Sequence, residues 1–267
     1  MNTIVVAMDD STDSLTSLEF GQHLALQLGV QVKAVSVVPD QADVTSRSAI
    51  LKARLDALRL DDIAVEVVAH HSVKDYLGGL ASREDVGLCM MAHGRRPVPE
   101  MLIGSVTAGV VRRSQRPIFL CGPRYNSRAH KQVDVLAVCV DGSALSEKML
   151  PFAAVLAKQL NARLQLLQVL DTSTARKPVS LNPADVAESA YLSELARRVG
   201  IDQALEVDWE VLHGDPADSI VNYLADSHNT MLAMTTHGRS GLSQVVAGSV
   251  SHEVVHEAPC PVAVLRP

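Results

Sequence analysis

Glycine and hydroxyl residues precede an apolar, helix-like stretch at two places in the chain, 92–107 and 236–251. The later segment reads THGRSGLSQVVAGSVS and the earlier one AHGRRPVPEMLIGSVT. A helix that opens at Gly248-Ser249 presents unpaired backbone N–H groups and the positive end of its dipole, and Gly248 has no Cβ to obstruct a phosphate. Ser249 and Ser251 can add hydroxyl donors, so the segment fits a phosphate site.

An aspartate ends the first apolar strand of each half, Asp9 in one and Asp141 in the other. Its carboxylate can accept a hydrogen bond from an adenine amino group or a sugar hydroxyl, which together with a phosphate site suits a mononucleotide. Each feature also has a simpler interpretation. A glycine before a helix can merely form a turn, and an aspartate after a strand can merely cap the next helix. The occurrence of both features in both halves favours the nucleotide.

Motifs of other nucleotide sites and of catalysis are missing. The sequence contains neither GxxxxGK[ST] nor a GxGxxG after a first strand. His93 and His237 resemble catalytic bases, but no nucleophile with an orienting acid accompanies them, so packing or nucleotide contact is the favoured role. His70 and His71 resemble a metal pair but have no third ligand near in sequence. We therefore predict a binding protein that is not an enzyme, without a metal site of its own, although phosphates can bring Mg²⁺ with them.

The chain is a tandem duplication of one domain. Residues 4–38 and 135–170 share a strand, an Asp-x-Ser turn, a helix and a second strand in the same order. Asp9 corresponds to Asp141 at an offset of 132 (141 − 9), whereas Gly104 corresponds to Gly248 at an offset of 144 (248 − 104). We place the extra residues of the second half in the loop 171–186, which is rich in proline and hydroxyl residues. The predicted domains are 1–124 and 132–267, with a linker at 123–131.

Strand-like and helix-like segments alternate within each copy. In the second copy we expect strands at 133–140, 163–170, 204–212, 230–236 and 260–267, and helices at 147–160, 184–200, 217–227 and 248–258. Ser143 or Ser146 can cap the first of these helices, and Gly200 can end the second. This alternation indicates an α/β fold of two tandem doubly wound domains, each a five-stranded parallel sheet flanked by four helices. Ligands bind such sheets beyond the carboxyl ends of the strands, where the strand order reverses.

The glycine segments, the VDGS turn at 140–143 and GDPADSI at 214–220 resemble the universal stress protein family, and the resemblance covers both halves. The ATP-binding signature of that family is Gly, two residues, Gly, nine residues, then Gly-Ser or Gly-Thr. Thr235 and Met91 occupy the position of the first glycine, so both copies depart from the signature at the same place. The resemblance implies an adenine nucleotide alpha hydrolase-like fold and a ligand that is ATP or a relative such as ADP or AMP.

The resemblance also implies which residues would hold a nucleotide. An aspartate would meet the base or ribose, a residue of the second strand would offer main-chain contacts to the base, and the glycine segment would hold the ribose and phosphates. In the second copy these residues are Asp141, Val169, Met234, His237, Gly238, Gly248, Ser249, Val250 and Ser251. In the first copy they are Asp9, Val37, Met90, His93, Gly94, Gly104, Ser105, Val106 and Thr107.

We expect the carboxy-terminal site to be the better ATP binder and the amino-terminal site to be more degenerate. Thr235 adds a branched side chain where the family prefers none, and Met91 would crowd the ligand further. In the first copy Pro97 stiffens the loop, and residues 71–73 replace the Gly-Asp-Pro turn of 214–216.

The resemblance implies a stress-response protein that binds an adenine nucleotide in a regulatory role, and two alternatives stay open. One is a nucleotide-independent scaffold, which Thr235 and Met91 favour. The other is a slow ATPase, which only kinship of fold favours. Family members commonly pair through the last strand, so 116–122 and 260–267 are expected to associate as a pseudo-dimer within one chain, with a homodimer as a further alternative.

Composition and charge limit which partners and which cellular compartment we expect. The formal net charge is −6, the isoelectric point is near 5.9 and the basic residues are scattered, which argues against a nucleic-acid partner. No secretory leader pattern follows Met1, and no apolar run approaches the roughly 18 residues that span a bilayer, so we expect a cytoplasmic protein without a membrane partner. Cys89, Cys121, Cys139 and Cys260 lie in or beside strand-like runs without a CxxC pair and are expected to be buried free thiols.

Overall fold

A computed structural model describes the chain except for residues 61, 94–102, 172–182 and 238–247 and the side chains of 183–186 and 188. Strands and helices alternate along both copies, as the sequence predicts. The elements of the first copy are β1 (Thr3–Ala7), α1 (Ser14–Leu28), β2 (Gln31–Val38), α2 (Asp43–Ala57), β3 (Ala64–Ala69), α3 (Val73–Ala81), β4 (Val86–Met91), α4 (Ser105–Arg113) and β5 (Ile118–Cys121).

The second copy repeats this order with one additional short helix. Its elements are β6 (Val135–Cys139), the 3₁₀ helix η1 (Ser146–Met149), α5 (Leu150–Leu160), β7 (Arg163–Asp171), α6 (Pro183–Gln203), β8 (Val207–Gly214), α7 (Pro216–Ala225), β9 (Thr230–Thr235), α8 (Ser249–Glu257) and β10 (Val262–Leu265).

Two predicted helix ends are wrong. The helix expected at 147–160 is split into η1 and α5, with Pro151 in the first turn of α5, and neither Ser143 nor Ser146 is a helix N-cap. Helix α6 continues beyond Gly200 to Gln203, and the chain turns at Ala204, whose φ of 49° lies in the left-handed region. The Leu205 N–H then donates to the Gly200 carbonyl at 3.1 Å. A non-glycine residue thus makes the turn that the sequence suggested for the glycine.

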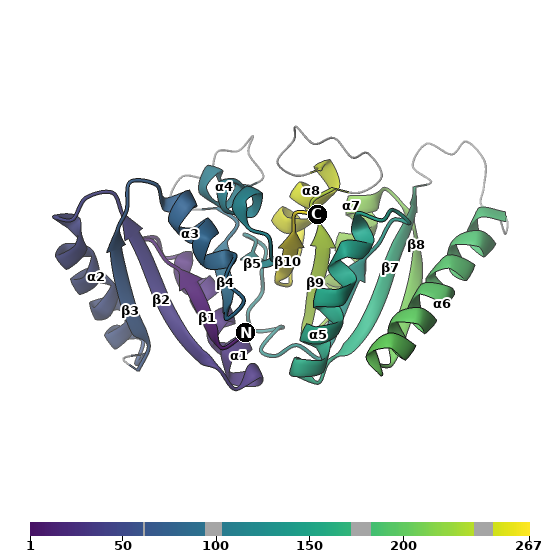
Figure 1. The fold of residues 1–267 in the computed structure, drawn as a ribbon, viewed down its shortest axis with the longest axis horizontal. Coiled ribbons are helices and arrows are strands. Elements are labelled where there is room, and N and C mark those ends of the chain that lie inside the picture. The colour runs from purple at the N-terminus through teal and green to yellow at the C-terminus, as the bar shows by residue number, and fades with distance from the viewer. Residues whose placement is uncertain (61, 94–102, 172–182, 238–247) are drawn as a thin grey trace.

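The strands that the structure describes join one ten-stranded sheet in the order β3-β2-β1-β4-β5-β10-β9-β6-β7-β8. Neighbouring strands are parallel within each copy, and β5 pairs antiparallel with β10, where Phe119 lies opposite Ala263. Figure 1 shows the two copies side by side, with this pair at the centre of the molecule. The expected pairing of the two last strands within one chain is therefore confirmed.

Helices cover both faces of the sheet. Leu18 of α1, Leu51 of α2 and Leu195 of α6 belong to the core on one face, together with residues of α5. Leu77 of α3 and Val254 of α8 belong to the core on the other face, together with residues of α4 and α7. Because both faces are buried, the strands read as continuous apolar runs rather than alternating ones.

Polar contacts tie the copies together beyond the strand pair. The Gln27 side chain on α1 donates to the carbonyls of Val133 and Leu160, each at 2.9 Å. The segment 123–131 also packs on the second copy, where the Asn126 N–H donates to Pro259 O at 2.8 Å. The buried His130 accepts a hydrogen bond from the Thr230 N–H at 3.1 Å. The predicted linker is thus a packed part of the junction.

Among the helices that the structure describes, none combines the length and the apolar character needed to cross a bilayer. The four cysteines are free thiols, buried at Cys89, Cys121 and Cys260 and half-buried at Cys139.

Candidate functional site

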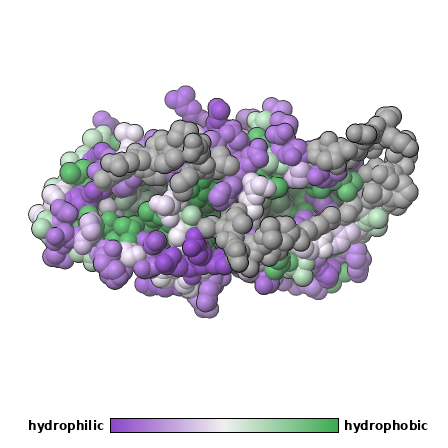
Figure 2. All heavy atoms as spheres, turned by 90° about the horizontal axis from the view of Figure 1, so that it is seen from above, coloured by the Kyte–Doolittle hydropathy of each residue, from purple (hydrophilic) through white to green (hydrophobic). Residues whose placement is uncertain are grey.

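The strand order reverses at corresponding places in the two copies. β1 lies between β2 and β4, and β6 lies between β7 and β9. The helices that follow β1 and β4 pack on opposite faces of the sheet, which leaves an opening at the carboxyl ends of these strands. Viewed onto this edge, Figure 2 shows apolar side chains exposed among polar ones in the amino-terminal half.

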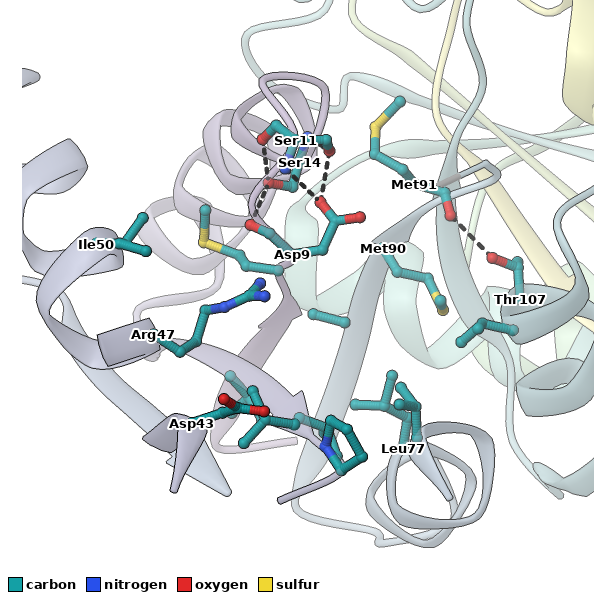
Figure 3. Close-up of a pocket in the computed structure, with 18 of the residues that line it drawn as sticks. Asp9, Ser11, Ser14, Asp43, Arg47, Ile50, Leu77, Met90, Met91 and Thr107 are labelled. Carbon is teal, nitrogen blue, oxygen red and sulfur yellow. Dashed lines mark hydrogen bonds between the residues drawn. The ribbon is translucent and has the colours of Figure 1, made fainter. Parts of the chain in front are cut away.

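A cavity of about 660 Å³ lies at this opening in the first copy. This volume falls within the range of small-molecule sites, roughly 300–1,000 Å³. The cavity is lined by the ends of β1, β2 and β4 and by α2, α3 and α4 (Figure 3). Six of the residues predicted for the amino-terminal site line it: Asp9, Val37, Met90, His93, Val106 and Thr107.

Asp9 forms a tight turn with the serines that follow it. Its Oδ1 accepts hydrogen bonds from the Ser11 N–H at 2.9 Å and from the Ser11 hydroxyl at 2.5 Å. The Ser14 hydroxyl donates to Ser11 O at 2.9 Å and closes the turn. Figure 3 shows the second carboxylate oxygen of Asp9 directed away from these serines. One oxygen therefore shapes the loop, and the other can accept a hydrogen bond from a ligand.

The second copy repeats this turn. Asp141 Oδ1 accepts from the Ser143 N–H at 3.0 Å and from the Ser143 hydroxyl at 2.6 Å. The Ser146 hydroxyl donates to Ser143 O at 2.9 Å. Ser143 and Ser146 are thus not helix caps but hydrogen-bond Asp141 and hold it in place.

The helices that would receive phosphates start in the same way in both copies. Gly104 and Gly248 are extended residues directly before α4 and α8, and their N–H groups donate to Ala92 O at 2.8 Å and Thr236 O at 2.7 Å. The first-turn N–H groups of α4, at 105–107, have no partner within the helix. The Thr107 hydroxyl donates to Met91 O at 3.0 Å and fixes the helix to the end of β4.

The residues at the position of the first signature glycine do not need a glycine backbone. Met91 and Thr235 end β4 and β9, and neither has a positive φ. The Thr235 hydroxyl donates to His237 O at 2.8 Å. Met91 lines the cavity, which stays open beside it.

The described site residues of the second copy occupy matching places. Val169 is near the end of β7, Met234 is near the end of β9, and Ser249, Val250 and Ser251 form the first turn of α8. The Ser251 hydroxyl is buried and donates to Gly248 O at 3.0 Å. Gly94 and Gly238 lie outside the described residues, as does Pro97.

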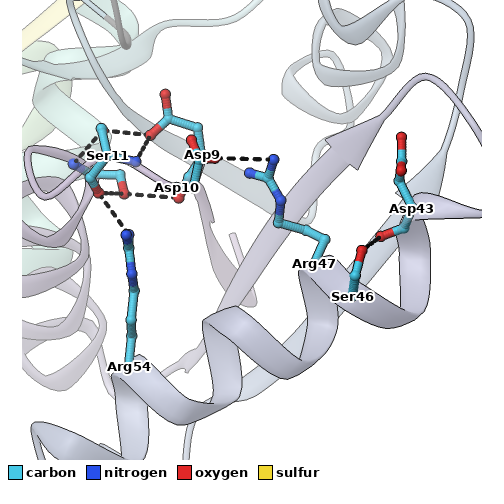
Figure 4. A network of polar contacts seen from close by, with 8 residues as sticks. Asp9, Asp10, Ser11, Asp43, Ser46, Arg47 and Arg54 are labelled. Carbon is cyan, nitrogen blue, oxygen red and sulfur yellow. Dashed lines mark hydrogen bonds and ion pairs between the residues drawn. The ribbon is translucent and has the colours of Figure 1, made fainter.

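Helix α2 adds two arginines that the sequence did not single out (Figure 4). Arg54 Nη1 donates to Ser11 O at 3.1 Å. Arg47 lines the cavity, and its Nη2 lies 3.5 Å from Asp10 Oδ2. A charged residue on an amphipathic helix carries no sequence signal of its own, because such residues are ordinarily solvated.

Histidines of the second copy approach the amino-terminal cavity. The ring of His93 lies edge-on to the ring of His256 on α8, with centroids 5.5 Å apart. Burial lowers the pKa of His252 below its ordinary value, and nearby His93 adds to this. The carboxy-terminal copy thus contributes side chains beside a residue that lines the first cavity.

Comparisons with known proteins identify a family model and relatives that match this chain. A model of the universal stress protein family matches residues 1–86 and 133–266. Universal stress protein YxiE of Bacillus subtilis is 27% identical over 144 residues, which cover 49% of this chain and 97% of that protein. Universal stress protein Rv2005c of Mycobacterium tuberculosis is 27% identical over 188 residues, which cover 69% of this chain and 63% of that protein.

A solved structure has the same fold along nearly the whole chain. The crystal structure of a universal stress protein from Archaeoglobus fulgidus covers 99% of this chain and 98% of its own, with a TM-score of 0.64 and 19% identity. At this identity the likeness concerns the fold alone, so the function has to be argued from the site.

Proposed function

The chain belongs to the universal stress protein family, and we propose that it binds ATP or a related adenine nucleotide in a regulatory, non-catalytic role. The observation that carries this proposal is the amino-terminal cavity, which has Asp9 on one wall and the start of α4 on another. An aspartate oxygen outside the turn suits a base amino group or a ribose hydroxyl. The first-turn N–H groups of α4 suit a phosphate.

The repetition of these elements supports a site in each copy. The Asp-Ser turns at Asp9 and Asp141 have the same hydrogen bonds, and Gly104 and Gly248 precede their helices in the same extended conformation. The higher affinity of the carboxy-terminal copy remains our prediction, because Met91 lines the first cavity and takes up room there.

A regulatory role is favoured over turnover by the surroundings of the histidines. The Thr236 hydroxyl lies 2.8 Å from His237 Nδ1, but Thr236 is only 1% exposed, so a substrate cannot reach this hydroxyl. His93 packs against His256. Any Mg²⁺ in the site would be held chiefly by the phosphates.

Replacement of the two aspartates by asparagine tests the proposal. In Asp9→Asn and Asp141→Asn, Oδ1 can still accept the serine hydrogen bonds of the turn, while the second oxygen becomes an amide donor. The protein is purified without added nucleotide and denatured, and released small molecules are identified by chromatography and mass spectrometry. The affinity for MgATP is then measured by calorimetry.

We expect each substitution to weaken the affinity of its own site about tenfold or more, the effect of losing a hydrogen bond to a charged group. Asp56→Ala, at an exposed position on α2, is the control and should bind like the wild type. If no nucleotide is released and millimolar MgATP leaves the melting temperature unchanged, the nucleotide proposal fails and a nucleotide-independent scaffold becomes the better account.

A further inference from the structure

The two copies differ at one helix position beside the candidate site. The offset of 144 residues that relates Gly104 to Gly248 also relates buried Leu51 of α2 to buried Leu195 of α6. By the same offset, Arg47 of the first copy corresponds to Tyr191 of the second copy in the repeat. This position faces the strand ends where the base of a nucleotide would lie.

The Arg47 side chain is largely buried, and its guanidinium makes few polar contacts with the described residues. Its side chain is only 16% exposed, and Asp10, at 3.5 Å, is its one polar partner among the described residues. Arginine has five N–H donors and a flat face, so most of its binding capacity is unused. Figure 3 shows Arg47 and Thr107 on opposite sides of the cavity, with Asp9 between them.

Tyr191, the corresponding residue of the second copy, is hydrogen-bonded to Glu147. Its hydroxyl donates to Glu147 Oε1 at 3.0 Å, and Arg198 binds the other oxygen of Glu147 at 2.7 Å. Burial raises the pKa of Tyr191, and the adjacent Glu147 adds to this. The second copy therefore offers no cation at the position where the first copy has one.

The charges around Arg47 limit what it can bind. Asp10 pairs with it, Asp9 and Asp43 line the same cavity, and Arg54 is bound to Ser11 O. These carboxylates repel an additional phosphate at this end. A neutral aromatic ring is not repelled, and a guanidinium packs favourably on its face.

We propose that Arg47 packs on the base of a nucleotide in the amino-terminal pocket and so makes that pocket select ligands with an aromatic base. Val38 and Pro39 from the end of β2, and Ile50 from α2, line the cavity with Arg47 and supply apolar surface for the same ring. The inference rests on the proposed nucleotide site and assigns its base end to a residue of this chain.

The test is carried out by calorimetry in an Asp141→Asn background, which weakens the second site. Binding of ATP, adenosine and tripolyphosphate is measured for the parent and for Arg47→Met, Arg47→Lys and Tyr191→Phe. Methionine keeps most of the apolar stem, so the fold is retained, and thermal melts verify this. Lysine keeps the charge but loses the flat face.

Arg47→Met should weaken ATP and adenosine binding alike, about tenfold, and leave tripolyphosphate binding within about twofold. Arg47→Lys should not restore the loss, and Tyr191→Phe should bind like the parent. Equal ATP affinity in the parent and Arg47→Met overturns the inference. So does full rescue by lysine, or an equal loss for tripolyphosphate, because each means a contact with phosphate instead. A parent that binds no adenine compound overturns this inference, because the amino-terminal pocket then holds no base. The proposed function fails as well only if the wild type, with Asp141 intact, also binds no adenine compound.

Discussion

Gln27 and Val133 are joined by a pair of hydrogen bonds between the two copies. Gln27 Nε2 donates to Val133 O at 2.9 Å, and the Val133 N–H donates to Gln27 Oε1 at 2.8 Å. The Gln27 amide thus bonds both backbone groups of Val133, just before β6, as a neighbouring strand would. This contact, on α1, lies apart from the β5–β10 pair and makes the junction depend on more than the sheet.

Gln27→Ala should lower the free energy of unfolding by about 2 kcal/mol, because two junction hydrogen bonds and a third to Leu160 O are lost. Urea unfolding followed by circular dichroism measures this change. Gln41→Ala removes the same side chain at an exposed position and should be nearly neutral. If the two substitutions have the same effect, Gln27 does not hold the copies together.

Gly122 allows a close backbone approach at the junction. A Cβ at this position would lie 2.1 Å from the Val255 carbonyl oxygen on α8, and a backbone atom cannot move aside as a side chain can. Gly122→Ala should therefore destabilise the protein by about 3 kcal/mol or more. Gly79→Ala, on helix α3 with open space around the added methyl, should be neutral or stabilising by about 0.5–1 kcal/mol. Thermal melts of both variants suffice, and comparable melting temperatures would contradict the steric argument.

His130 should make stability depend on pH. Burial lowers its pKa in the folded chain to about 4, against about 6.5 in an unfolded one. Between these values the unfolded chain binds more protons, so stability is fully present above pH 6.5 and is lost as the pH falls toward 4. The free energy of unfolding should drop by about 2 kcal/mol between pH 7.5 and 5 on this account.

His130→Asn tests the assignment. The asparagine oxygen can accept the Thr230 N–H bond but does not titrate in this range. Urea unfolding at the two pH values should show a much smaller difference in this variant than in the wild type. An unchanged difference would assign the pH dependence to another group.

The fold could be predicted because its signals are periodic and occur twice. Apolar strands buried on both faces alternate with helices in each copy, and the repeat confirmed each assignment with a second one. The errors came from single residues. Pro151 lies in the first turn of α5 next to the 3₁₀ turn, and Ala204 adopts the left-handed conformation that the sequence suggested for Gly200. Such choices depend on tertiary packing, which local propensity does not contain.

The candidate site was predictable only where its residues form motifs. Asp9 and Gly104 follow from the strand end and the helix start, and the structure brings their neighbours to one cavity. Arg47 could not be found in this way, because the matching residue in the repeat is Tyr191. The contact between His93 and His256 crosses from one copy to the other, so no spacing along the sequence indicates it.

Thr235 provides a further test of why this chain departs from the family signature. Its hydroxyl donates to His237 O, and it ends β9 in an ordinary extended conformation, so the threonine stabilises the strand end. Thr235→Gly should lower the free energy of unfolding by about 1–2 kcal/mol, through the lost hydrogen bond and the added backbone freedom. Thr235→Ser keeps the hydroxyl and should lose less than half of that. Urea unfolding of the two variants decides the point. A Thr235→Gly variant as stable as the wild type would mean that the threonine merely replaces the glycine and does not anchor the end of β9.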